Sequence, residues 1–182
     1  MKRFGLALLL WVSLAAVADE QVTLCYNWSC VAKADIVYDR YQWLEVTRLL
    51  GLARDAEGER ALLAQAVGRL YRWAGEQSPI RNDRAGNALD ADADGRMDCI
   101  DHSTSTTRLL KMLEGAGAFR WHRVLEPARR SRFVIAQHFA AVIEDRRNGE
   151  RFAVDSWFVD NGQPAVILPL AAWMEGEGPS VE

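Results

Sequence analysis

Cys99, His138 and Asp155 are the residues of this chain whose types and spacing suit nucleophilic chemistry. Cys99 is the odd one of three cysteines, because Cys25 and Cys30 lie close together near the start of the chain. A cysteine nucleophile needs a histidine to take its proton, and that histidine needs an orienting group. We therefore expect Cys99 to attack a carbonyl carbon, His138 to shuttle the proton and Asp155 to orient the imidazole.

The choice of base rests on the positions of the three histidines. His102 is three residues from Cys99 on one predicted helix, so its ring is expected to point along the helix surface. His122 lies in an arginine-rich stretch that reads as loop. His138 lies among apolar residues of a predicted strand, where a core histidine bonded to backbone is the alternative interpretation. Asp155 favours the catalytic one, because it interrupts an apolar strand and a buried carboxylate needs a partner.

An acidic run that includes Cys99 fits a calcium loop of the EF-hand kind. In such a loop, oxygens come from positions 1, 3, 5, 7, 9 and 12, and position 6 is glycine, here Gly95. Repulsion among the carboxylates favours a cation, and Ca²⁺ accepts many hard oxygens; a solvated acidic turn is the alternative. Aspartate in place of the usual glutamate at position 12 predicts weaker binding. The expected ligands are Asp90, Asp92, Asp94, the carbonyl of Arg96, Asp98 and Asp101.

The calcium loop and the thiol are predicted to act on each other. Position 10 of the loop is where the exiting helix begins, so Cys99 is expected in the first turn of that helix. A helix N-terminus stabilises a thiolate. Asp98 and Asp101 would raise the pKa of the thiol, and a bound calcium ion would offset their charge.

The first 18 residues are typical of a secretory signal peptide. Lys2 and Arg3 precede a short apolar stretch, and small residues follow at 16–18. A membrane anchor is the alternative, but the apolar stretch is short for a span. Without Lys2 and Arg3 the 22 basic residues become 20, against 25 acidic ones, so nothing suggests a nucleic-acid partner. The sequence predicts a periplasmic or secreted protein without stable membrane insertion.

The remaining chain is expected to be one domain over residues 19–175, with a flexible tail at 176–182. Export implies an oxidising compartment, so Cys25 and Cys30 are expected to form a disulfide. Two free buried thiols are the alternative.

Hydrophobic periodicity predicts helices first and antiparallel strands after them, which is an α+β layout with the helices packed on the sheet. Asp55 is expected to cap the second helix. The expected helices span 34–52, 56–77 and 99–114, a loop spans 78–88, strands span 133–143, 151–158 and 165–168, and a last helical turn spans 169–174.

The triad also predicts the register of the hairpin between the second and third catalytic residues. A tight turn at Asn148–Gly149 would place Asp155 opposite Val142, too far from His138 for a hydrogen bond. A four-residue connection, 146–149, places Asp155 opposite Ala140 instead, with His138 as its diagonal neighbour on the same face. We therefore expect the longer connection.

Three segments together resemble the transglutaminase-like core, and most closely the bacterial transglutaminase-like cysteine proteinases. They are 97–110, 137–142 and 153–157, which carry Cys99, His138 and Asp155 at separations of 39 and 17 residues. The resemblance covers roughly residues 73–157 and implies a papain-like triad with the nucleophile at a helix N-terminus. It also implies calcium-binding acids beside the cysteine. The complete EF-hand-type loop and the Cys25–Cys30 pair depart from that group.

The resemblance implies an exported cysteine peptidase or amidase that acts on a peptide or protein substrate. The N–H of Cys99 would form half of an oxyanion hole, with Trp73, Gln77 and Asn82 as candidates for the other donor. An amine-accepting transamidase is a close variant. An inert, calcium-stabilised binding protein on the same fold, or a plain calcium-binding module, is the alternative from another class, because fold alone does not give function.

Overall fold

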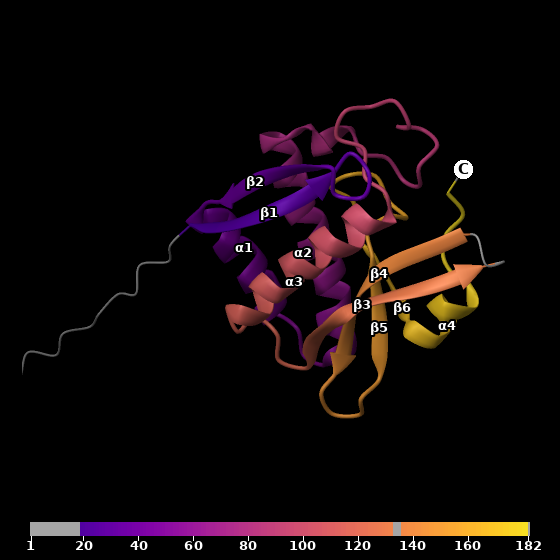
Figure 1. Ribbon diagram of the computed structural model, residues 1–182. Helices are drawn as coiled ribbons and strands as arrows, with labels where there is room; N and C mark the ends of the chain where they lie inside the picture. Colours follow the sequence, from indigo (N-terminus) through magenta and orange to yellow (C-terminus); the bar gives the residue numbers. More distant parts are fainter. Residues whose placement is uncertain (1–18, 133–135, 182) are drawn as a thin grey trace, which may run out of the picture.

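The structure is a computed structural model that describes residues 19–132 and 136–181. Within these residues it contains four α-helices, a short 3-10 helix (η1) and two antiparallel sheets (Figure 1), so the predicted α+β class is confirmed. The predicted signal peptide, 1–18, lies outside the described residues. In chain order the elements are β1 (Glu20–Tyr26), β2 (Ala32–Tyr38), α1 (Arg40–Gly51), α2 (Ala56–Gln77), η1 (Pro79–Asn82), α3 (Cys99–Gly115), β3 (His122–Arg132), β4 (Ala136–Asp145), β5 (Arg151–Asp155), β6 (Val166–Pro169) and α4 (Leu170–Glu175).

The segment 34–52, which we expected to be one helix, is a strand followed by a helix. Residues 32–38 form β2, which pairs with β1 in an N-terminal hairpin. Along β2 the buried side chains alternate with exposed ones, and Ile36 and Tyr38 are fully buried. Asp39 then starts α1, because its carboxylate accepts the N–H of Tyr41 and that of Gln42. The helix prediction was wrong for 34–38, because the apolar residues there fit the period of a strand as well as that of a helix.

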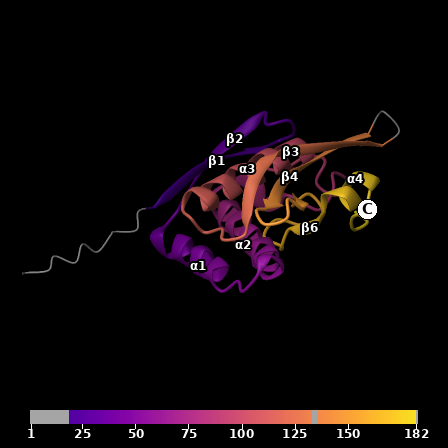
Figure 2. The same ribbon diagram turned by 90° about the horizontal axis from the view of Figure 1, so that it is seen from below.

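α2 and α3 form the centre of the main core. α2 spans the predicted residues, and the carboxylate of Asp55 caps it by accepting the N–H of Gly58 at 2.7 Å. α3 contacts β1 on one side and both β3 and β4 on the other, so it runs between the two sheets (Figure 1). The view from below shows α1 and α2 side by side (Figure 2). The helix that Cys99 opens is therefore held from two directions.

The four-stranded sheet has the order β3-β4-β5-β6. Glu144 lies opposite Arg151, and the N–H of Asp145 donates to the carbonyl of Glu150 at 2.8 Å. The connection between β4 and β5 is thus the four residues 146–149, as predicted. Ala141 pairs with Val154, so the next pair of the ladder places Asp155 opposite Ala140, as expected. Part of the strand predicted over 133–143 lies outside the described residues.

β3 is a strand where we expected an arginine-rich loop. It is the edge strand next to β4, and its register shifts between Leu125 and Ala128. Pro127 lies inside that shift, where a residue without an N–H breaks the ladder. This local irregularity hides the strand from a sequence pattern.

A buried hydrogen bond between a carboxylate and an imidazole ties the start of β3 to α2. Glu59 and His122 are both fully buried, and the ring Nδ1 of His122 lies 2.8 Å from Oε1 of Glu59. The same carboxylate accepts the backbone N–H groups of Arg120, Trp121 and His122. Burial alone would raise the pKa of Glu59, but the hydrogen bonds from the ring and from these three N–H groups lower it below the ordinary value.

The C-terminal part packs against the outer face of the four-stranded sheet. α4, the predicted helical turn, places the fully buried Trp173 in a second core cluster with Ala140, Ala153 and Phe158. The segment from residue 176 onward, which the sequence predicts to be flexible, also contacts this cluster through Val181.

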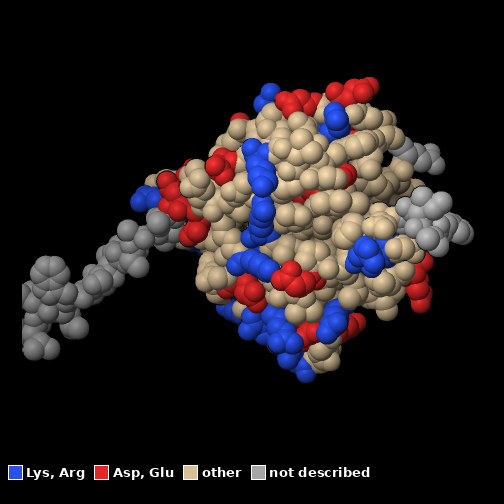
Figure 3. Space-filling view, in the orientation of Figure 1, with Lys and Arg blue, Asp and Glu red and all other residues tan. Residues whose placement is uncertain are grey.

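The surface carries charges of both signs. Basic and acidic side chains are mixed at the end of the molecule formed by the β4–β5 hairpin (Figure 3), where Glu144 pairs with Arg123 and Arg151. Across residues 19–132 and 136–181, no helix combines the length and the apolar character needed to cross a membrane.

Candidate active site

Cys99 is the first residue of α3, as the loop pattern predicted. Asp98 caps the helix: its carboxylate accepts the N–H of Ile100 at 3.0 Å and that of Asp101 at 2.9 Å. The Asp101 side chain accepts the N–H of Asp98 in return, which completes a capping box. The Asp98 carboxylate thus accepts the N–H groups of Ile100 and Asp101, and the N–H of Cys99 stays available to a ligand.

His138 on β4 and Asp155 at the end of β5 form the hydrogen bond that the predicted register requires. Nε2 of His138 lies 2.7 Å from Oδ2 of Asp155, whose side chain is 1% exposed. That oxygen also accepts the indole N–H of Trp173 at 2.8 Å, and Oδ1 accepts the backbone N–H of Trp157 at 3.2 Å. Three donors therefore hold the buried carboxylate, and it fixes the orientation of the imidazole.

Aromatic rings surround the His138 imidazole. Its centroid lies 4.7 Å from that of Trp157 and 5.6 Å from those of Phe158 and Trp173. The ring is packed on several sides while its side chain keeps 13% exposure. The imidazole is thus held in place and still reaches solvent.

The thiol of Cys99 lies against the backbone that flanks His138. Sγ lies 3.8 Å from the carbonyl of Gln137, and the N–H of Phe139 also faces it. Among the described residues no hydrogen bond joins Sγ to His138. Because Nε2 is bonded to Asp155, Nδ1 is the ring nitrogen that can exchange a proton with the thiol.

The surroundings of Cys99 disfavour the thiolate. Burial raises the pKa of the Cys99 thiol, and the charges of Asp98 and Asp155 add to this effect. The N–H groups of Phe139 and of Cys99 itself act in the opposite direction. The expected effect of Asp98 on the thiol is therefore present, and Asp155 acts beside it in place of the expected Asp101.

Cys99 and His138 open onto a cleft of about 370 Å³. Asp155 lies behind the histidine rather than on the cleft surface. The wall combines polar groups with a tryptophan and a methionine, as in many small-molecule and peptide sites. The cleft is lined by Asn87, Cys99, Arg130, Ser131, Gln137, His138, Trp157, Met174, Glu175 and Gly176.

Two features of the first half of the predicted calcium loop bear on cation binding, the glycine turn and an unpartnered oxygen of Asp90. Gly95 has a φ of +98°, and a Cβ there would meet the carbonyl oxygen of Pro79 at 1.9 Å, so the turn position requires glycine. Asp90 is 4% exposed, and its Oδ1 is buried without a hydrogen-bond partner. A metal ion would satisfy this oxygen. The other oxygen of Asp90 accepts the N–H of Arg84 at 2.9 Å. Asp92 and Asp94 are exposed, and Oδ1 of Asp94 accepts the side-chain amide of Asn27 at 2.8 Å.

The second half of the loop has other partners, which lie in the turn between β1 and β2. The N–H of Asn27 donates to the carbonyl of Arg96 at 2.7 Å. Asp98 Oδ2 accepts the N–H of Ser29 at 3.0 Å, and Asp101 Oδ1 accepts that of Cys30 at 2.6 Å. The expected ligands Arg96, Asp98 and Asp101 are thus already hydrogen-bonded, and calcium binding stays a prediction.

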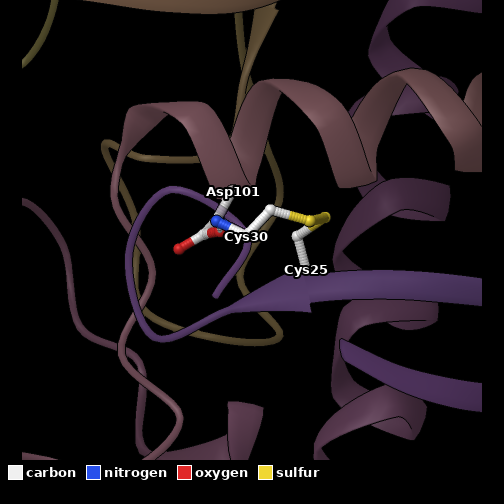
Figure 4. Close-up of side chains that lie close together, drawn as sticks. All are labelled: Cys25, Cys30 and Asp101. Atoms are coloured by element: carbon white, nitrogen blue, oxygen red, sulfur yellow. Dashed lines mark hydrogen bonds between the residues drawn. A yellow bond between two sulfur atoms is a disulfide. The ribbon is translucent and has the colours of Figure 1, made fainter. Parts of the chain in front are cut away.

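The disulfide predicted between Cys25 and Cys30 is present and closes this turn. All four residues from Asn27 to Cys30 have positive φ angles, between 52° and 65°. Figure 4 shows the disulfide beside Asp101. Cys25, Cys30 and Asp101 place potential metal-ligand atoms close together, but the two sulfurs are bonded to each other and cannot act as thiolate ligands.

His102 lies beneath the site in a buried polar network rather than along the helix surface. Its Nδ1 lies 2.9 Å from the hydroxyl of Ser156, and its Nε2 lies 3.2 Å from Oδ2 of Asp83. Burial by itself lowers the pKa of His102, but the neighbouring Asp83 outweighs it and raises that pKa. Thr106 joins the network through Ser156 at 2.9 Å. His102 therefore belongs to the polar network beneath the cleft, where its ring nitrogens face Ser156 and Asp83 rather than the thiol.

The three oxyanion-hole candidates named from the sequence have other partners. Trp73 is in the main core, Gln77 bonds the backbone of Val37, and the side-chain amide of Asn82 donates to the carbonyl of Asp94. The residues missed by sequence reasoning are Asn87 and Trp173, which reach the site through long-range contacts. No local motif marks either of them.

The structure thus brings Cys99, His138 and Asp155 together, and it places the acidic loop immediately before the cysteine. Comparison of the chain with protein-family models, curated proteins and solved structures gives no match.

Proposed function

We propose that this chain is an exported, calcium-dependent cysteine hydrolase, a peptidase or amidase of transglutaminase-like type. The observation that carries the proposal is the 2.7 Å hydrogen bond between His138 and Asp155, beside the cleft that Cys99 lines. A thiol at a helix N-terminus with an oriented imidazole is the arrangement that acyl transfer through a cysteine needs.

The reaction follows from the atoms of these three residues. Sγ of Cys99 attacks a peptide or amide carbonyl carbon while Nδ1 of His138 takes the thiol proton. The N–H of Cys99 binds the developing oxyanion. His138 then gives the proton to the leaving amine as the C–N bond breaks, and Asp155 stabilises the imidazolium in between. Water resolves the thioester by the same proton route.

The wider arrangement supports the transglutaminase-like assignment and the export. The cysteine opens a helix, and the histidine and aspartate come from neighbouring antiparallel strands, as the resemblance implies. The Cys25–Cys30 disulfide suits an oxidising compartment.

Calcium is part of the proposal through the loop before Cys99. Asp90, Asp92 and Asp94 would hold the ion, which would fix the loop and offset negative charge beside the thiol. Burial and the charge of Asp98 raise the pKa of Asp101 to about 6, so the second half of the loop would also gain from a nearby cation.

The test is acylation of Cys99 by p-nitrophenyl acetate in the presence of calcium, followed by mass spectrometry of the peptides. We expect acetyl-Cys99, and a loss of acylation rate on the order of 10³-fold in Asp155→Asn. Asp35→Asn, on the exposed side of β2, is the matched control. Absence of acetyl-Cys99 in a folded protein whose thiol reacts with iodoacetamide would favour the inert binding protein. Preferential resolution by an added primary amine would instead identify a transamidase.

A further inference from the structure

The oxyanion hole of the proposed enzyme lacks a second donor among the residues that the sequence suggested. One backbone N–H, that of Cys99, makes an incomplete hole, because each donor contributes separately to stabilising the tetrahedral intermediate. Two side-chain amides line the cleft with the thiol, those of Asn87 and Gln137. Gln137 precedes His138 on a strand, so their side chains leave opposite faces of the sheet. Asn87 is the better candidate.

Trp157 fixes the orientation of the Asn87 amide. Its indole N–H donates to Oδ1 of Asn87 at 2.7 Å. An indole nitrogen is a donor only, so the atom that faces it must be the amide oxygen. The NH₂ group of Asn87 then points elsewhere, and it makes no hydrogen bond with any described residue. A carboxamide held by its oxygen at a cleft wall presents a free donor to whatever occupies the cleft.

The backbone before Asn87 is tied to the same tryptophan. The N–H of Gly86 donates to the carbonyl of Trp157 at 2.9 Å, and Gly86 has a φ of +76°, which glycine adopts without strain. Trp157 follows closely after Asp155, and its ring packs at a tilt against that of His138. One short stretch of chain therefore positions both the imidazole and the Asn87 amide.

We propose that Nδ2 of Asn87 is the second oxyanion-hole donor and that Trp157 positions it; this inference rests on the proposed function. In the acylation step the Cys99 sulfur–carbon bond forms and the thiol proton passes to His138. The carbonyl oxygen takes up the electron pair of its π bond. Asn87 and the N–H of Cys99 hydrogen-bond that oxygen until the pair returns and the leaving group departs.

Two reactions of the same thiol separate this role from a structural one. Attack on the ester carbonyl of p-nitrophenyl acetate builds an oxyanion, and p-nitrophenolate leaves with the electrons of the broken C–O bond. Alkylation by iodoacetamide displaces iodide at a saturated carbon and builds no oxyanion. Loss of the donor slows the first reaction alone, whereas damage to the thiol or to the fold slows both.

The experiment measures both rates in the protein for wild type, Asn87→Ala and Trp157→Phe. We expect acylation to fall about 100-fold in Asn87→Ala, with alkylation unchanged. Trp157→Phe keeps an aromatic ring but frees the amide to turn, so it should lose less acylation than Asn87→Ala. Gln65→Ala, which removes an exposed side-chain amide of α2, is the matched control. Melting temperatures confirm that each variant is folded.

Three outcomes would overturn the inference. Equal acylation of wild type and Asn87→Ala removes Asn87 from the hole and leaves the proposed function standing. Loss of acylation in Gln137→Ala, without loss in Asn87→Ala, assigns the donor to Gln137. A wild-type protein that is alkylated but never acylated overturns the proposed function, and this inference falls with it.

Discussion

Substitution of Glu59 by glutamine should destabilise the protein strongly, although it changes a single atom. The carboxylate is fully buried and accepts the N–H of Arg120 at 2.7 Å through one oxygen. Through the other it accepts the N–H and the ring N–H of His122, at 2.9 and 2.8 Å. In glutamine one of these oxygens becomes an NH₂ group, so a donor faces a donor on that side whichever way the amide turns.

The size of the effect follows from the number of donors. A buried N–H left without an acceptor costs about 1–3 kcal/mol, and each remaining hydrogen bond loses about 1 kcal/mol because the acceptor is no longer charged. Together these terms give a free energy of unfolding lower by about 3–5 kcal/mol. At about 2–4 °C per kcal/mol for a domain of this size, the melting temperature should fall by roughly 10 °C.

The assay is thermal unfolding followed by circular dichroism, with Glu57→Gln as the control, since Glu57 is an exposed glutamate in the same helical turn. The pKa of Glu59 is lowered in the folded protein, so its stabilisation is present above the ordinary value of 4.5 and is lost as the pH falls through the folded pKa. Glutamine does not titrate. The difference in melting temperature between wild type and Glu59→Gln should therefore be constant near neutral pH and become smaller in acid. The reasoning would be refuted if Glu59→Gln lowered the melting temperature no more than Glu57→Gln does, or if its effect did not depend on pH.

Two further predictions concern the loop and the cysteines. Calcium binding should raise the melting temperature, because a ligand that binds the native state alone stabilises it by mass action, and Asp90→Asn should weaken the calcium effect measured by isothermal titration. A chelated protein that takes up no calcium would remove the ion from the proposal. Alkylation without reductant should modify Cys99 alone, because Cys25 and Cys30 are joined; three modified cysteines would contradict that pairing.

The elements that the sequence predicted well are those in which local and long-range requirements agree. The helix over 56–77 has a cap and a broad apolar stripe, and it forms as expected. The β4–β5 connection was predicted against the simpler turn rule, because Asp155 had to reach His138. A chemical requirement between two distant residues thus predicted a backbone register that the turn sequence alone does not favour.

The missed elements depend on contacts that a sequence pattern does not contain. The apolar residues of β2 fit the period of a helix as well as that of a strand, and pairing with β1 makes the segment a strand. β3 is broken by Pro127 and is held as a strand by its neighbour β4. Trp173 comes from the last helix, and its role as a donor to Asp155 exists only once the second core cluster has formed.

Asp155, which ends β5, and the two residues after it serve three separate partners. Asp155 holds the imidazole, Ser156 bonds the network beneath α3, and Trp157 bonds the amide of Asn87. Loss or insertion of one residue in β5 would shift all three side chains by one position along the chain, and it would turn Asp155 to the opposite face of the sheet. A substitution in this stretch removes one of the three contacts, whereas a deletion would break all three at once and disable the cleft while much of the core sequence stayed intact.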